Sequence, residues 1–423
     1  MKTQSGMILP LAAAAFLSAS LQLQFLPGVV LFLPGVGMMH EPVAIARTLV
    51  DRGAFADPYP GLPTGPTAHM PPLFPLFLYM LIRFFGETPA FGTAALFLCL
   101  LMHAVYAGLF VPVSRLFFRS EAPGTAAALL AILLPSFPVL PQWEAIYVAV
   151  GSMVFCLLSA NCLSRRLSFG TKTLAVGGMA GVLLLLSSTA LMVVVPCLLY
   201  LVFGERWPLG RAVVFLLAVG FVTMLVLTPW AVRNYYALGS PIFLRGNLGL
   251  EIALSNNDSA ESSQVENLRN GTSESLHPHL SRNQALQVKA LGEVEYNRRK
   301  MREGIFWIRD HPRRFTVLTL QRARDFWFPN PDESVCAYSL WIVTLASAGG
   351  LVLLTRSRAP SGLFFVSVLA LFPIVYYFLH SSIRYRAPIA WVTVLLAGYF
   401  LTAAWTGTTA ARIRGWLLAR LGM

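Results

Sequence analysis

Residues 64–77, TGPTAHMPPLFPLF, place four prolines and His69 at the start of a short apolar run. Pro71 and Pro72 favour extended backbone ahead of residues 73–85. A helix needs about 20 apolar residues to cross a membrane, and the run 73–85 is shorter than that. We therefore expect residues 73–85 to form a shallow or re-entrant helix rather than a membrane span.

The rest of the chain is dominated by apolar residues. Of 423 residues, 56% are hydrophobic and 12% are charged, whereas soluble domains carry about 25% charged residues. The formal net charge is +13, which in such a chain indicates basic loops and contact with anionic lipid. No basic run interleaved with aromatic residues indicates a nucleic-acid surface. The composition predicts an all-α polytopic membrane protein.

Ten segments are apolar enough to be candidate membrane spans. The pair 173–187 and 189–204 could also form one long helix. No convincing small-residue cleavage pattern follows the first segment, so we interpret it as a span rather than a signal peptide. The candidates are 7–26, 90–113, 122–140, 143–163, 173–187, 189–204, 211–231, 336–355, 359–379 and 388–406.

The basic residues predict the orientation of these spans. Lys and Arg gather in alternate loops, for example at Arg115, Arg165 and Arg356, and again after the last span. Placing them in the cytoplasm puts both termini inside and leaves two long segments outside, 27–89 and 232–335.

The acidic residues agree with this division. Of 19 Asp and Glu residues, 12 lie between Glu251 and Glu333. We expect a seven-helix module with the first outer loop (1–231), a large outer loop with interfacial helices (232–335), and a three-helix module with a cytoplasmic tail (336–423). Within the large loop, the polar stretch 258–283 is typical of a mobile loop. Residues 285–327 are expected to be helical, with a break at Pro312 and with an interfacial second half.

Glu41 opens a predicted amphipathic helix, EPVAIARTLVDRG. Val43, Ala46 and Val50 share one face of it, and Gly53 suits its end. One interpretation is structural, because a carboxylate at a helix start gains about 0.3–1 kcal/mol from the helix dipole. The other is a general base that faces a cavity at the membrane surface.

Further polar residues fall on the same predicted side of the membrane. Glu144 begins the fourth span, and Arg233 directly follows the seventh. Arg384 and Arg386 lie between the last two spans, against the positive-inside rule. Arginine suits phosphate recognition, but a boundary position, a headgroup contact, snorkelling to lipid phosphate or a topology error would also explain these residues.

His69 has a structural alternative, as a loop histidine bonded to backbone. His277, His279 and His311 lack zinc-site spacing, so no metal is predicted. The cysteines show no CxxC pairing and are interpreted as small core residues. They are Cys99, Cys156, Cys162, Cys197 and Cys336.

Taken in order, six stretches between residues 40 and 388 resemble bacterial GT-C membrane glycosyltransferases near glycosyltransferase family 39. Relatives of that family include protein O-mannosyltransferases and the aminoarabinose transferases of lipid A. The stretches are HEPVAIARTLVDRGAFADPY, TGPTAHMPPLFPLF, QWEAIYV, LTPWAVRNYYALGSPIFLRGNLGLEIALSNND, HPRRFTVLTLQRARDFW and IRYRAP.

The resemblance implies seven shared helices, a variable C-terminal set and surface-lying helices in the first outer loop. It also implies inverting transfer of a sugar from a polyprenyl-phosphate donor to an acceptor hydroxyl at the outer face of the bacterial inner membrane. In that family an acidic residue of the first outer loop is the proposed base or acceptor-orienting group, and by position this role falls to Glu41. Many relatives carry two adjacent acids, whereas this chain has His40 and Glu41, which leaves metal dependence open. Ser187 and Ser188 stand where the family often has an arginine or other polar group.

The hypothesis for the site combines these elements. Glu41 is the base, one set of residues positions sugar or acceptor, and arginines bind the phosphate. No cofactor is predicted. The positioning residues are Asp57, His69 and Glu144, and the arginines are Arg233, Arg384 and Arg386.

Three other function classes remain open. A polysaccharide polymerase or ligase also uses polyprenyl-linked sugars, but usually concentrates function in one late outer loop. A transporter or lipid flippase would place ionisable groups near the middle of spans, and almost every charge here lies at a predicted boundary. The third class is a non-catalytic partner scaffold. It stays open because the pair His40 and Glu41 contains a single acid.

Overall fold

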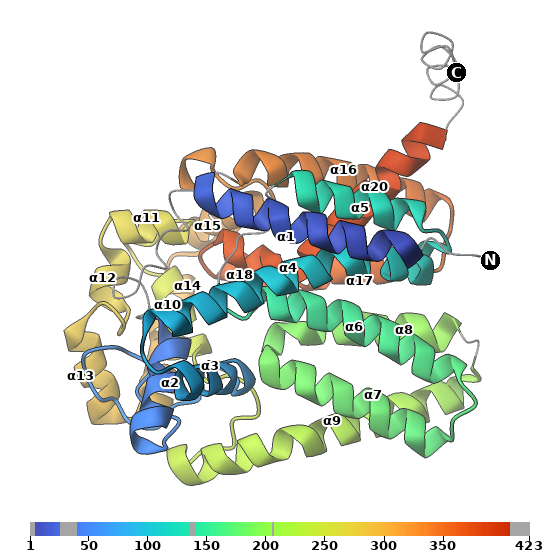
Figure 1. The fold of residues 1–423 in the computed structure, drawn as a ribbon. Coiled ribbons are helices and arrows are strands. Elements are labelled where there is room, and N and C mark those ends of the chain that lie inside the picture. The colour runs from blue at the N-terminus through green and yellow to red at the C-terminus, as the bar shows by residue number, and fades with distance from the viewer. Residues whose placement is uncertain (1–4, 26–39, 135–140, 205–206, 335, 407–423) are drawn as a thin grey trace.

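The computed structural model describes residues 5–25, 40–134, 141–204, 207–334 and 336–406. Within these ranges the chain is helical, and its β structure is limited to isolated bridges such as that between Ala56 and Pro66. Long apolar helices run side by side, and shorter helices gather at one end of them (Figure 1).

The membrane helices follow the apolar segments of the sequence. Seven stretches of the described residues are long and apolar enough to cross a membrane, and α1, α5 and α8 are shorter apolar helices. The length criterion thus confirms seven of the ten expected spans. The helices are α1 (Ile8–Phe25), α4 (Pro89–Phe118), α5 (Ala122–Leu133), α6 (Ala145–Ser164), α7 (Phe169–Leu186), α8 (Leu191–Gly204), α9 (Leu209–Leu238), α16 (Ala337–Arg356), α17 (Ser361–Leu371) with α18 (Ile374–Phe378), and α19 (Ile383–Arg386) with α20 (Ala390–Thr406).

Residues 173–204 form two helices rather than one. Ser187 has an extended backbone, and a 3₁₀ turn at Ser188–Ala190 separates α7 from α8. The Ser187 and Thr189 hydroxyls bond each other at 3.0 Å. Short hydroxyl side chains compete with the helix for backbone groups, which explains the interruption at this position.

The two helices expected between residues 40 and 89 are present in the structure. Helix α2 (Glu41–Arg52) ends at Gly53 in the left-handed conformation, and α3 (Leu73–Phe85) covers the run that is too short to span. Val43 and Ala46 of α2 pack against Phe74 of α3. This apolar contact fixes the start of α2 over the membrane helices.

The prediction of a mobile loop at 258–283 is wrong. This stretch contains two short helices, α11 (Gln264–Arg269) and α12 (Thr272–Leu276). Ser263 caps α11 through the Glu266 N–H, and the Asn267 amide bonds the Glu261 carbonyl. The polar side chains that suggested irregular structure instead satisfy the backbone groups of these turns.

The remaining helices between residues 232 and 334 are α10 (Leu248–Ser255), α13 (Arg282–Leu291), α14 (Glu293–Asp310) and α15 (Pro312–Trp327). The break at Pro312 is confirmed, and Gly292, with φ +76°, makes a second one. Helix α10 packs on α14, and a Cβ on Gly249 would collide with the Asn297 carbonyl. This close crossing sets the position of Glu251 on α10.

Arg322 of α15 ties the outer helices to the C-terminal module. Its side chain is fully buried. It donates to the Asn256 amide oxygen at 3.1 Å and to the Phe378 carbonyl at 3.2 Å, and also to the Ser255 carbonyl. A buried guanidinium is costly unless it is bonded, so these acceptors hold α10, α15 and α18 in one arrangement beside residues 380–386.

Candidate active site

Glu41 lies at the centre of a cluster of histidines that come from distant parts of the chain. Its residue is 8% exposed. Its Oε1 lies 3.9 Å from Nε2 of His277 and 3.8 Å from Nδ1 of His279. The neighbouring His40 ring stacks on His279, with centroids 6.1 Å apart. Residues 277–279 therefore lie over the start of α2.

The surroundings of Glu41 favour its ionised form. Burial opposes ionisation, but His277, His69, His279 and the backbone N–H at the start of α2 outweigh burial and lower the pKa of Glu41 to about 2. Burial lowers the pKa of His69 to about 3 despite the pull of Glu41, and it lowers the pKa of His277 as well. At neutral pH a carboxylate thus lies beside neutral imidazoles.

His69 is held by its ring and by its backbone. The ring Nδ1 lies 3.2 Å from the Tyr59 hydroxyl, and the His69 carbonyl accepts from Arg245 Nε at 3.0 Å. The preceding residues are fixed by Glu293, whose carboxyl group accepts from the Ala68 N–H at 2.7 Å and from the Thr67 hydroxyl. Residues 67–69 are therefore held between α14 and the α9–α10 connection.

Asp57 and Arg233 make contacts that shape this loop. Asp57 pairs with Arg52 at 3.1 Å and accepts from the Gly65 N–H at 2.8 Å. Arg233 donates to the Thr67 carbonyl at 2.7 Å and to the Phe55 carbonyl. These are loop-holding contacts, and the substrate-binding roles expected for both residues stay predictions.

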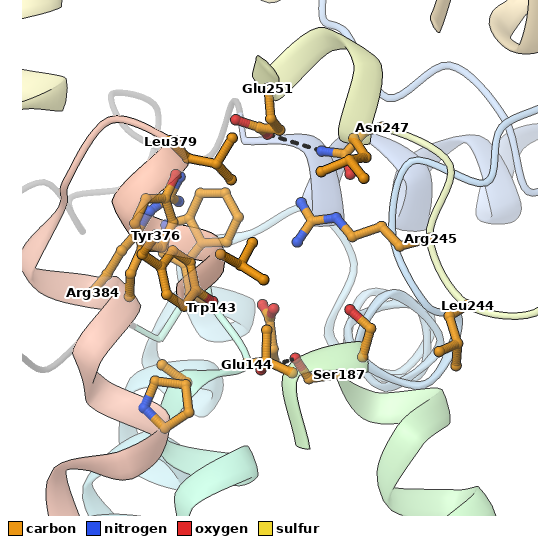
Figure 2. A pocket seen from close by; sticks show the side chains of 17 residues that line it. Trp143, Glu144, Ser187, Leu244, Arg245, Asn247, Glu251, Tyr376, Leu379 and Arg384 are labelled. Atoms are coloured by element: carbon orange, nitrogen blue, oxygen red, sulfur yellow. Dashed lines mark hydrogen bonds between the residues drawn. The ribbon is translucent and has the colours of Figure 1, made fainter. Parts of the chain in front are cut away.

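A cavity of about 350 Å³ adjoins this cluster. Figure 2 shows Glu144 and Arg245 extending into it from two sides. Glu144 Oε2 is buried without a hydrogen-bond partner in the described residues, and Asn247 donates to Glu251 at 2.9 Å. The polar and aromatic residues that line the cavity are Trp143, Glu144, Ser187, Ser188, Thr189, Arg245, Asn247, Glu251, Tyr376, Arg384 and Tyr385.

Arg384 links the cavity to Glu41. Its guanidinium lies over the Trp143 ring, 4.0 Å from the centroid, and donates to the Tyr385 hydroxyl at 3.4 Å. Trp143 also contacts the His40 ring at 5.3 Å. His40 and Trp143 therefore link Glu41 to the cavity, although Glu41 is not itself one of its lining residues.

Arg386 lies outside the cavity lining. It is 2% exposed, donates to the Trp327 carbonyl at 3.1 Å and stacks over the Trp327 ring. Its predicted phosphate contact stays a prediction. The structure thus brings Glu41, His69, Glu144 and Arg384 to one region and assigns other contacts to Asp57, Arg233 and Arg386.

Sequence reasoning missed four residues of this region. Arg245 and Glu251 lie in a stretch that carried the family resemblance, but no spacing rule pointed to them. His277 and His279 belong to the HPH segment at residues 277–279. Only their pairing with Glu41, which is distant in the sequence, indicates that they belong to the site. Within the described residues, no group of three or more His, Cys, Asp or Glu side chains is arranged to hold a metal ion.

The fold is all-α and of the GT-C type. It matches a crystal structure of the Archaeoglobus fulgidus oligosaccharyltransferase, in complex with Zn and sulfate, with a TM-score of 0.54 and 13% identity. The match covers 97% of this chain and 51% of that protein, so the chain spans about half the length of the oligosaccharyltransferase. At this identity the likeness shows the fold alone.

No family model matches the sequence. No curated protein matches it either. The chain is a multi-pass membrane protein with a GT-C fold, and its resemblance to glycosyltransferase family 39 stays an expectation.

Proposed function

We propose that the chain is a membrane glycosyltransferase that moves a sugar from a polyprenyl-phosphate donor to an acceptor hydroxyl. The observation that carries the proposal is a buried, ionised Glu41 beside a cavity whose wall holds two arginines, Arg245 and Arg384. The GT-C fold supports it, because the fold is shared with a protein described as an oligosaccharyltransferase.

The two arginines suit the donor phosphate. Arg245 uses its Nε on the His69 carbonyl, which leaves its terminal nitrogens for a ligand. Arg384 Nε is buried without a hydrogen-bond partner among the described residues. Guanidinium groups bind phosphate oxygens in pairs. They would stabilise the charge that grows on the phosphate as the sugar departs.

The apolar part of the cavity suits the lipid chain of the donor. Leu244, Val375 and Leu379 line it together with the arginines. A polyprenyl phosphate has this same combination of an anionic head and an apolar tail, so one cavity would accommodate the whole leaving group.

Glu41 would act on the acceptor hydroxyl. The oxygen of the hydroxyl attacks the anomeric carbon, the bond from this carbon to the phosphate oxygen breaks, and the phosphate leaves with the electron pair. The hydroxyl proton passes to Glu41. A carboxylate with a pKa of about 2 is a weak base, so Glu41 first orients the hydroxyl and takes its proton late, when bonding to the sugar has made the hydroxyl acidic.

Other polar groups near the cavity suit sugar hydroxyls. Glu144 and Glu251 offer carboxylate oxygens, and Asn247 already bonds Glu251. His69 is held by Tyr59, and it is close enough to Glu41 to lower the pKa of that carboxyl group. We assign these groups to positioning sugar and acceptor, because ordered hydrogen bonds fix the reacting atoms.

The proposal is tested with the full chain reconstituted in lipid vesicles and supplied with a panel of labelled polyprenyl-phosphate sugars. The expected result is protein-dependent release of polyprenyl phosphate with transfer of label to an acceptor. Movement of intact donor across the bilayer without cleavage would instead show a flippase, and neither cleavage nor donor binding across the panel would contradict the proposal. Repeated addition to one glycan would identify a polymerase.

A further inference from the structure

A second and larger cavity lies at the other end of the helix bundle. It measures about 780 Å³. Leu199 of α8 lines this second cavity, whereas Ser187, Ser188 and Thr189, which precede α8, line the first cavity. Helix α20 likewise lines it at Tyr399, eleven residues beyond Pro388 in the first cavity. At 1.5 Å per residue the two regions are roughly 15–20 Å apart, so this cavity is separate from the proposed active site.

The walls of the second cavity are aromatic. Phe117 stacks on Phe364 with centroids 4.5 Å apart, and it contacts Tyr200 at 5.2 Å. Phe118 stacks on Tyr399 at 4.6 Å. All five rings line the cavity. They form a rigid apolar surface suited to the acyl chains of a lipid.

One end of this cavity is built for an anion. Helix α17 begins there at Ser361, has no side-chain cap and carries no acid in its first turn. The Ser361 residue is 2% exposed, lines the cavity, and its hydroxyl has no hydrogen-bond partner in the described residues. A helix N-terminus presents free N–H groups and a partial positive charge, which favour a phosphate.

One arginine lines the cavity, and two more lie close to the start of α17 in the sequence. Arg119 lines the cavity, and no salt bridge to Arg119 is formed by the carboxylates of the described chain. Arg356 is the last residue of α16, and Arg358 lies in the connection between α16 and α17. Basic pockets beside membrane helices attract anionic lipid headgroups.

We propose that the second cavity binds one phospholipid with a net negative headgroup, its phosphate held by Ser361, the start of α17 and Arg119, and its acyl chains packed on the aromatic wall. A buried hydroxyl without a partner in the described residues, a helix start and an arginine all line this one cavity. We propose a lipid rather than a free anion because the polar residues and the aromatic wall line the same cavity. A free anion would leave the aromatic part of the cavity empty.

Two variants test the proposal with little risk to folding. Ser361→Ala removes only a hydroxyl that makes no internal bond. Arg119→Asn removes the charge and keeps a residue that tolerates the left-handed backbone found there, φ +55°. Arg166→Asn is the matched control, because Arg166 lies at the same end of the bundle and does not line the cavity.

The measurement is thermal unfolding of the full chain, purified in detergent and stripped of lipid, with added phosphatidylglycerol, phosphatidylcholine or inorganic phosphate. Phosphatidylglycerol is expected to raise the unfolding temperature most. The two cavity variants should need about 5–10-fold more of it, with the unfolding temperature without lipid unchanged and the control like the wild type.

Three results would overturn the proposal. Equal effects of phosphatidylglycerol and phosphatidylcholine would show that the headgroup charge is not recognised. An equal effect of inorganic phosphate would show a site for free anions rather than for lipid. Cavity variants with the same response as the wild type would show that lipid acts elsewhere on the bundle. Each readout is independent of glycosyl transfer.

Discussion

At the scale of single residues, Glu41 is defined by what surrounds it. An acid buried in apolar surroundings would take up a proton, but the nearby histidines and the backbone N–H at the start of α2 lower the pKa of Glu41 to about 2, far below neutral pH. The neutral state of His69 avoids a second buried charge that would need a partner. Under the proposed function, an acceptor hydroxyl would meet a carboxylate with lone pairs available for a hydrogen bond rather than a preformed ion pair.

Arg245 and Arg384 carry the predicted contact with the donor phosphate. We expect Arg245→Gln and Arg384→Gln each to lower kcat/KM for the lipid-linked donor by about 10–1,000-fold, because each substitution removes a charge-assisted bond to the leaving group. Steady-state kinetics in vesicles measures this. Arg83→Gln, an exposed position on α3, is the control, and an equal loss in that variant would contradict the assignment.

Some of these residues could be found from sequence and others could not. Glu41, Glu144 and Arg384 stand out because charge beside an apolar span is rare and needs a reason. Arg245 lies in a connection with no periodic pattern. His277 and His279 gain their role only when residues 258–283 fold back on α2, and this contact between distant segments leaves no mark in local sequence.

At the scale of elements, the segment 67–69 depends on one buried carboxyl group. Glu293 of α14 accepts bonds from Thr67 and Ala68. Burial raises its pKa to about 7, against the effect of these two bonds and of Arg233. The loop that presents His69 is thus attached through a group that titrates near neutral pH.

This predicts a pH dependence of stability. The folded-state pKa of Glu293 lies above its ordinary value of 4.5, so its contribution to stability is fully present below about pH 4.5 and is lost as the pH rises through about 7. The unfolding free energy of the wild type should therefore fall by on the order of 1–3 kcal/mol as the pH rises over this range. This fall should be absent in Glu293→Gln. Thermal unfolding in detergent from pH 5 to 8 measures it.

Glu295→Gln is the matched control for this experiment, since Glu295 lies on the same helix and pairs with Arg298 at the surface. The control should keep the pH profile of the wild type. An unchanged profile in Glu293→Gln would contradict the role given to this carboxyl group.

Helix positions could largely be predicted, and the shape of the outer segment could not. The bounds of α3 follow directly from its apolar run, and Pro312 marks the start of α15. In contrast, the serines and asparagines of 258–283 are compatible with both loops and caps. Their hydrogen bonds, such as that from the Gln264 N–H to the Ser381 carbonyl at 2.8 Å, depend on the C-terminal module.

At the scale of the whole molecule, close packing of helices sets the distance between the two cavities. Helix α20 packs on α16 and α5, and a Cβ on Gly398 would collide with the Pro123 carbonyl. Small residues allow such approach in membranes. The C-terminal helices therefore carry one wall of each cavity, Arg384 at one end and Tyr399 at the other.

The most direct test of the proposed function compares Glu41→Gln with Glu87→Gln, an acid of the same outer loop that pairs with Arg47 at 3.1 Å. Turnover of polyprenyl-phosphate sugar is measured in vesicles together with donor binding. The account predicts a fall of at least about 100-fold in turnover, near-unchanged donor binding and normal folding for Glu41→Gln, with full activity in Glu87→Gln. Undiminished sugar transfer by well-folded Glu41→Gln would contradict it.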